Sequence, residues 1–116
     1  MSAKKAGASF ERFIADHLAA EVDDRIDRRV KTGNADKGDL GGVRTPTGAR
    51  VVAELKDYGG RYNVGAWLKE AEQERVNDNA DVALVIAKRR GTRDPNEQVV
   101  FMTVRDLIHL LKGTQQ

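Results

Sequence analysis

The chain contains no cysteine, only two prolines and few aromatic side chains, which make up 5% of its 116 residues. Without cysteine, neither disulfide bonds nor thiolate zinc sites can form. No apolar stretch approaches the roughly 20 residues that a membrane-spanning helix needs. The lysines near the N-terminus are not followed by the apolar run of a signal peptide. We therefore expect a cytoplasmic protein.

Charged residues are abundant, at 33% of the chain against 40% hydrophobic residues. This balance is typical of a globular domain with a highly charged surface. A chain of this length can build one hydrophobic core but not two. We expect a single domain over residues 1–116, with loose ends at residues 1–7 and 113–116. Because aromatics are scarce, Val, Leu, Ile and Ala should form the core.

Hydrophobic periodicity predicts three helices, over residues 8–20, 64–77 and 104–112. Short apolar or alternating runs predict strands over residues 28–32, 40–43, 50–56, 82–87 and 98–102. The resulting order is one helix, three strands, a helix, two strands and a last helix. It predicts an α/β fold in which helices flank a mixed central β-sheet on both faces.

Thr103 is expected to cap the last helix, because threonine at this position can accept a hydrogen bond from the first helical turn. The four large aliphatic residues of that helix recur at helical spacing, so we expect them to face inward. They are Val104, Leu107, Ile108 and Leu111.

Three residues in the middle of the chain are the strongest candidates for a functional site. Asp39 stands in a Gly-Asp-Leu segment, and Glu54 and Lys56 end the apolar run that starts at Val51. Side chains alternate along a strand, so Glu54 and Lys56 should project from the same face. If Asp39 closes on that face, two carboxylates could hold a hard divalent cation through oxygen ligands, with Lys56 beside it.

A plainer interpretation is that Glu54 and Lys56 form a solvated pair on an edge strand, which stabilises a sheet by well under ~1 kcal/mol. Asp39 would then be an ordinary turn residue. Asp36 also competes for the role of Asp39, although Lys and Gly follow it rather than a strand. On the first predicted helix, Glu11 borders the apolar stripe and can reach a cleft, using the ~100° step per residue.

The net charge is only +2, but the basic residues fall in clusters. One cluster precedes Asp39 and the other follows the apolar run at 82–87, and both are candidates for contact with nucleic-acid phosphates. Tyr58 and Arg61 lie in the loop that follows Lys56. The residues predicted to contact DNA are Arg28, Arg29, Lys31, Tyr58, Arg61, Lys88, Arg89 and Arg90.

From residue 10 to residue 101, the ordered set of a helical acid, Gly-Asp-Leu, Glu-Leu-Lys, a helix and an apolar strand resembles the PD-(D/E)xK nuclease superfamily. Within it, the chain is most similar to small archaeal and phage-type Holliday junction resolvases. Glu11 matches the family's helical acid, Asp39 its central aspartate, and Glu54 and Lys56 its E-x-K pair. Gly38 stands where the family pattern has proline.

The resemblance implies a restriction-endonuclease-like fold and a Mg²⁺ or Mn²⁺ cofactor. It implies that Asp39, Glu54 and the backbone carbonyl of Leu55 are metal ligands, that Glu11 supports the metal, and that Lys56 orients water or stabilises the transition state. On the second helix, Glu72 or Gln73 lies where many members carry a site residue.

The function implied is metal-dependent cleavage of DNA phosphodiesters at four-way junctions by a homodimer, in a bacterial, archaeal or phage-infected cell. Two alternatives stay open. The chain could be another nuclease of this fold, of nickase, flap or mismatch type, or a non-catalytic DNA-binding domain. Clustered carboxylates repel phosphate and one another without a cation, which favours the enzyme.

Overall fold

The computed structural model describes residues 3–30 and 36–113. Its elements follow the order α1 (Ala3–Glu21), β1 (Asp27–Arg28), β2 (Leu40–Gly41), β3 (Val51–Lys56), α2 (Val64–Asn77), β4 (Val82–Ala87), a 3₁₀ turn η1 (Pro95–Glu97), β5 (Val99–Phe101) and α3 (Val104–Lys112). This order of helices and strands is the predicted one. The predicted strand over 28–32 falls partly on residues outside the described part.

The five strands form one mixed sheet in the order β1-β2-β3-β4-β5. The central strands β3 and β4 are parallel and pair over their whole length, from Val51 with Val82 to Lys56 with Ala87. The other pairs are antiparallel. Helix α2 connects the two parallel strands, as a crossover connection must. The predicted α/β fold with a mixed central sheet is therefore confirmed.

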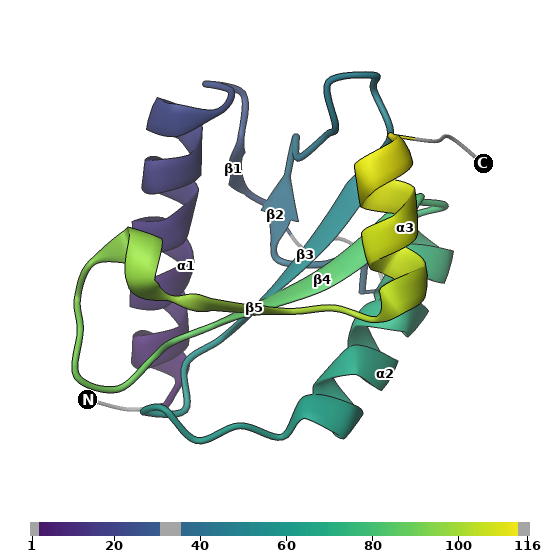
Figure 1. Ribbon diagram of the computed structural model, residues 1–116. Helices are drawn as coiled ribbons and strands as arrows, with labels where there is room; N and C mark the ends of the chain where they lie inside the picture. The colour runs from purple at the N-terminus through teal and green to yellow at the C-terminus, as the bar shows by residue number, and fades with distance from the viewer. Residues whose placement is uncertain (1–2, 31–35, 114–116) are drawn as a thin grey trace.

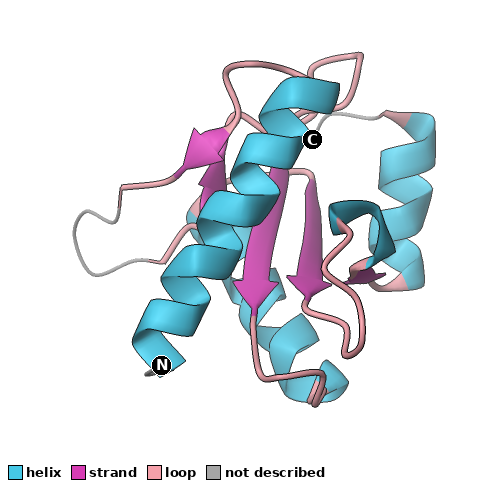
Figure 2. Ribbon diagram, turned by 90° about the vertical axis from the view of Figure 1, so that its left-hand side faces the viewer, coloured by secondary structure: helices cyan, strands magenta, loops and turns pink. Residues whose placement is uncertain are grey.

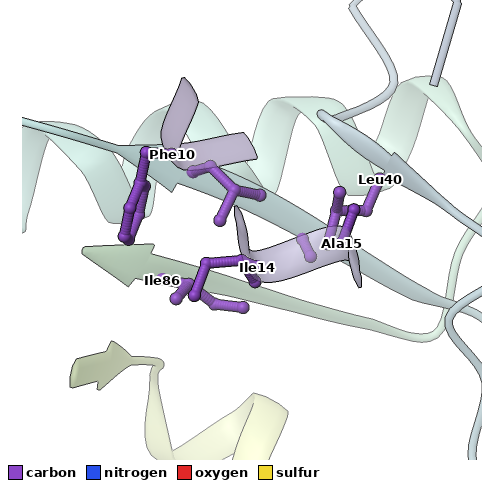
Figure 3. Close-up of a cluster of buried hydrophobic side chains, with 7 residues drawn as sticks. Phe10, Ile14, Ala15, Leu40 and Ile86 are labelled. Atoms are coloured by element: carbon purple, nitrogen blue, oxygen red, sulfur yellow. The ribbon is translucent and has the colours of Figure 1, made fainter. Parts of the chain in front are cut away.

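Helices α1 and α2 cover opposite faces of the sheet (Figures 1 and 2). On one face, Phe10 and Ile14 of α1 pack with Ala53 and Leu55 of β3 (Figure 3). On the other face, Trp67 of α2 packs with Val52, Val85 and other small apolar side chains. Alternate residues of β3 thus enter different clusters, as expected for a strand buried on both faces.

Helix α1 begins at Ala3, so residues 3–7 are helical rather than a loose end. At the other end, Gly113 adopts a left-handed conformation and its N–H donates to the carbonyls of His109 and Leu110, which ends α3. None of the helices in the described part is both long and apolar enough to cross a membrane.

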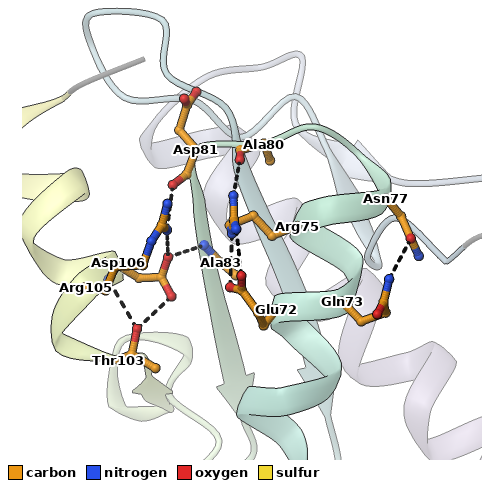
Figure 4. A network of polar contacts seen from close by, with 10 residues as sticks. All are labelled: Glu72, Gln73, Arg75, Asn77, Ala80, Asp81, Ala83, Thr103, Arg105 and Asp106. Carbon is orange, nitrogen blue, oxygen red and sulfur yellow. Dashed lines mark hydrogen bonds and ion pairs between the residues drawn. The ribbon is translucent and has the colours of Figure 1, made fainter. Parts of the chain in front are cut away.

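Helix α3 is turned with its apolar side outward, so the prediction that this side faces the core is wrong. Val104, Leu107, Ile108 and Leu111 are all exposed, whereas Asp106 is buried. One carboxylate oxygen of Asp106 accepts the N–H of Ala83, on the part of β4 that β5 does not pair with (Figure 4). The need of this N–H for a partner gives a physical reason for the orientation of α3.

Thr103 caps α3 as predicted, since its hydroxyl accepts the N–H of Asp106 at 3.2 Å. The same hydroxyl donates to the Asp106 carboxylate, and Arg105 also contacts this carboxylate at 2.8 Å. Figure 4 shows these polar groups gathered between α3 and β4. The polar side of the helix, with its hydrogen bonds satisfied, is the side that meets the sheet.

Candidate metal and phosphodiester site

Glu54 and Lys56 lie on the face of β3 that α2 covers. The Lys56 ammonium forms an ion pair with Glu70 of α2, with 2.9 Å between Nζ and Oε2. Glu54 is only 4% exposed although it carries a carboxylate. Glu54 and Lys56 therefore share one face of the strand, as predicted. They do not form a solvated pair on an edge strand. β3 is central in the sheet, with neighbours on both sides.

Asp39 immediately precedes β2, and its side chain lies against β3 close to Glu54. Its side chain is 2% exposed, and its Oδ2 accepts the backbone N–H of Leu55 at 2.8 Å. Its own N–H donates to the carbonyl of Ala53. These two bonds fix Asp39 against β3, so that its carboxylate stands beside that of Glu54.

Gly38 is required by this arrangement. Its φ angle is +95°, and a Cβ at this position would lie 2.9 Å from a methyl carbon of Val52. Proline cannot adopt such an angle, because its ring holds φ near −65°. The glycine found where the family pattern has proline thus follows from the local backbone. The Gly38 N–H also donates to the Asp36 carboxylate at 2.9 Å.

A pocket of about 220 Å³ opens where these elements meet. All four residues predicted to be catalytic line it. It is lined by Gly7, Glu11, Asp36, Asp39, Glu54, Leu55, Lys56, Asp57, Tyr58 and Glu70. We call it the acidic pocket. It lies at the carboxyl end of β3, an edge at which α/β proteins commonly bind ligands.

Glu11 forms part of the pocket wall from α1, as its position beside the apolar stripe predicted. Its carboxylate is also bonded by the Arg28 guanidinium, at 3.2 Å from Nε to Oε1. Arg28 is therefore near the acidic pocket, as an ion-pair partner of one of its acids.

Helix α2 contributes acids that the sequence analysis did not assign to the site. Oxygens of Asp36, Glu54, Glu70 and Glu74 all lie within 4.8 Å of one another, a set that can hold a metal ion. Glu74 is 1% exposed. The two residues singled out on this helix, Glu72 and Gln73, lie elsewhere. Glu72 bonds Arg75 and Gln73 bonds Asn77 (Figure 4).

In the part of the chain that the structure describes, three buried carboxylate oxygens of this set have no hydrogen-bond partner, namely Oε2 of Glu54 and both oxygens of Glu74. Burial raises the pKa of Glu54 far above its ordinary value, and the nearby carboxylates of Asp39 and Glu74 raise it further. Burial also raises the pKa of Glu74, to about 7. Carboxylates crowded in a dry interior must bind protons or a cation.

Lys56 remains a cation in this setting. Burial lowers the pKa of its ammonium group, but the bond to Glu70 and the charge of Glu54 outweigh burial, so the pKa is raised overall. At neutral pH, Lys56 therefore carries a fixed positive charge at the rim of the acidic pocket. Tyr58, also in the pocket wall, packs at a tilt against Trp67, with 5.4 Å between ring centroids.

The described residues among the predicted DNA contacts lie in several parts of the structure. Lys88, Arg89 and Arg90 line a second cavity, formed largely by the loop after β4. Arg29 is held elsewhere, because its guanidinium bonds the buried Asp78 at 2.8 Å. Arg61 is exposed in the loop after Tyr58. Lys31 lies outside the described residues.

Comparison of the chain with protein-family models, with curated proteins and with solved structures gave no match. The site itself combines clustered carboxylates, two of them buried in the pocket wall, with one lysine at the rim and a basic cavity nearby.

Proposed function

We propose that the protein is a metal-dependent DNA endonuclease that cuts phosphodiesters at four-way junctions. One observation carries the proposal. Glu54 and Glu74 lie together in a buried site beside Lys56, and three of their carboxylate oxygens have no hydrogen-bond partner among the described residues. Such an arrangement is costly unless the carboxylates bind protons or a cation, and oxygen-rich sites suit Mg²⁺ or Mn²⁺.

The residues present fit a divalent cation. Glu54 would be the central ligand. Asp36, Glu70 and Glu74 would lie around the ion with it, and Asp39 and the Leu55 carbonyl are further candidate ligands from the pocket wall. A bound divalent cation supplies polarisation of the scissile phosphate and of the attacking water. Glu11 supports the site from α1.

Lys56 acts on the negative charge that develops on the phosphate as water attacks phosphorus. A fixed ammonium group in a poorly hydrated pocket stabilises such charge strongly. The water oxygen forms the new bond to phosphorus, the bond to the 3′ oxygen breaks, and the products carry a 5′-phosphate and a 3′-hydroxyl. Glu70 holds Lys56 in place through their ion pair.

The order of the acids along the chain supports a restriction-endonuclease-like nuclease, and the four-way junction is the substrate that the resemblance favours. Recognition would depend on shape and backbone phosphates, since phosphate contacts position a protein on DNA without reading sequence. A junction has two strands to cut across a two-fold axis, which a symmetric homodimer can do.

The outward-facing side of α3 suits a contact between two copies. Its four exposed aliphatic residues form one continuous stripe, and exposed apolar patches of this kind mark interaction surfaces. Sedimentation should give a dimer for the wild type, and Ile108→Glu should shift the protein to a monomer. A wild-type monomer at every concentration used for cleavage would remove the dimer from the proposal.

The nuclease proposal is tested by offering labelled four-way junction, linear duplex, flap and single-stranded DNA, with Mg²⁺ or with EDTA. Paired symmetric nicks in the junction alone, dependent on Mg²⁺, support the full proposal. Equal cutting of the other DNAs keeps the nuclease and removes the junction. Binding without cutting of any DNA favours a non-catalytic DNA-binding domain.

A further inference from the structure

Residues 88–93, between β4 and η1, surround a cavity lined mainly by basic side chains. We call this segment the basic loop. The cavity has a volume of about 400 Å³ and is lined by Gly59, Lys88, Arg89, Arg90, Gly91, Thr92 and Arg93. It is separate from the acidic pocket, and the two pockets have no lining residue in common.

Most of the basic side chains in this cavity form no ion pair with the carboxylates of the described residues. Arg89 pairs with Glu97 at 3.2 Å, and both side chains are exposed. Within the described residues, no carboxylate forms an ion pair with Lys88, Arg90 or Arg93. Like charges held close together raise the local potential and attract an anion.

The side chain of Gln98 braces the basic loop at three points. Its amide oxygen accepts the N–H of Arg89 at 2.7 Å, and its amide nitrogen donates to the carbonyl of Asp94 at 2.9 Å and that of Thr92 at 3.4 Å. Gly91, with a φ angle of +87°, provides the turn. The cationic groups therefore extend from a braced backbone, which reduces the entropy lost when an anion binds.

The cavity lies directly beside the acidic pocket. Asp57 and Tyr58 line the acidic pocket and the next residue, Gly59, lines the basic cavity. The Arg90 Nε donates to the Gly59 carbonyl at 3.4 Å. The N–H of Lys88 donates to the carbonyl of Lys56 at 2.9 Å, so the two pockets follow the adjacent carboxyl ends of β3 and β4.

Gly60 keeps the two walls in contact. A Cβ on this residue would lie 2.7 Å from the Cβ of Arg90. Its φ angle of +88° also favours glycine. The loop after β3 and the basic loop can therefore approach each other closely, which keeps the two pockets adjacent.

We propose that the basic loop is a phosphate subsite, which holds the backbone phosphate next to the one cut at the acidic pocket. This proposal rests on the proposed nuclease function for the identity of the polyanion as DNA. An acidic pocket alone repels a phosphodiester, whereas a neighbouring cationic cavity holds the strand and presents the adjacent linkage to the metal site. The subsite positions the substrate and takes no part in bond breaking.

The test uses binding in EDTA, so that it does not depend on cleavage. Labelled junction DNA is prepared with a single neutral methylphosphonate at each linkage in turn around the branch point. Wild-type protein is compared with Arg90→Gln/Arg93→Gln, and with Lys69→Gln/Lys112→Gln as a control of equal charge change. Both control residues are exposed and line neither pocket.

We expect one neutral linkage to weaken wild-type binding by about tenfold, as removal of one charge-assisted hydrogen bond does. The Arg90→Gln/Arg93→Gln variant should bind the DNAs with and without this neutral linkage equally. Its salt dependence should be shallower by about 0.9 for each phosphate that the variant no longer neutralises. The Lys69→Gln/Lys112→Gln control should keep both the wild-type salt slope and the sensitivity to that linkage.

A variant that keeps the wild-type sensitivity at every linkage would overturn the subsite. Inorganic phosphate is the second ligand, observed through the backbone amide NMR signals of residues 88–93. If it shifts them while no linkage affects DNA binding, the loop is a free-phosphate site and the proposal is wrong. If the linkage effect is found but Mg²⁺ supports no cutting, the subsite stands and the nuclease fails.

Discussion

Glu54 on β3 and Glu74 on α2 lie close together in the interior, and three of their four carboxylate oxygens have no hydrogen-bond partner within residues 3–30 and 36–113. Each side chain is less than 5% exposed. Two carboxylates rarely meet in this way in a stable core, because each loses its hydration and repels the other. Their proximity is understandable if a divalent cation binds between them.

Glu54→Gln should lower DNA cleavage by at least about a hundredfold, since it removes the central metal ligand. Asp39→Asn should act in the same direction. Binding of junction DNA should be unchanged or tighter, because a negative charge near the phosphate is removed. Gel cleavage and fluorescence anisotropy measure the two effects. Glu21→Gln, an exposed change at the end of α1, is the control, and persistent cutting by both site variants would refute the site.

Lys56→Ala should reduce turnover by about 10²–10³ with a much smaller effect on affinity, because its charge acts mainly on the transition state. Single-turnover kinetics at saturating DNA separates the two quantities. Glu70→Gln keeps the lysine but removes its ion-pair partner, so we expect a smaller loss of turnover. A defect confined to DNA affinity in Lys56→Ala would mean that the lysine only binds the substrate.

Without metal, the protein should lose stability as pH rises. The pKa of Glu74 is raised from 4.5 to about 7 in the folded state. Between these values, the folded protein holds a proton that the unfolded chain has released, so the free energy of unfolding falls with increasing pH. Glu74→Gln should remove this part of the slope and stabilise the metal-free protein at pH 8 by roughly 1–3 kcal/mol.

Urea denaturation in EDTA from pH 5 to pH 8 measures this slope. Glu72→Gln on the same helix is the matched control, because Glu72 is paired with Arg75 and its pKa is lowered by that bond. In the Glu72→Gln variant, the free energy of unfolding should still fall as the pH rises above 5. Equal pH profiles for wild type and Glu74→Gln would show that burial does not raise the pKa of the Glu74 carboxyl.

Asp106→Ala should destabilise the fold more than Leu111→Ala, although one residue is charged and the other is aliphatic. Removing Asp106 leaves the N–H of Ala83 without its partner and removes contacts with Thr103 and Arg105, at a cost of about 2 kcal/mol. Leu111 is 76% exposed, so its truncation should cost less than about 0.5 kcal/mol. Urea denaturation is measured at a concentration where sedimentation gives a monomer. The reverse ranking would place the apolar side of α3 inside.

Much of the fold could be predicted because its patterns are local. The bounds of α2 and β4 match the predicted 64–77 and 82–87. A continuous apolar run such as β4 is among the simplest patterns to interpret. The orientation of α3 could not be predicted in this way. An amphipathic helix has two distinct sides, and its sequence does not say that an unpaired N–H on β4 will select the polar one.

The candidate site was predictable from β3, but the contribution of α2 was not predicted. The Glu-Leu-Lys segment identifies Glu54 and Lys56, and a period of two places them together. Glu74 was missed because the resemblance directed attention to Glu72 and Gln73. Helical spacing alone could have identified Glu74. It follows the buried Trp67 by seven positions and so lies on the same face of the helix.

Direct counting of bound Mn²⁺ tests the central claim, which is that the partnerless carboxylates of Glu54 and Glu74 hold a divalent cation. Electron paramagnetic resonance measures free Mn²⁺ as protein is titrated at pH 7.5, with wild type, Glu54→Gln and the control Glu72→Gln. We predict that the wild type and the control bind Mn²⁺, that Mg²⁺ competes for the site, and that Glu54→Gln binds at least about tenfold more weakly. Equal binding by wild type and Glu54→Gln, or no binding by either, would contradict this claim.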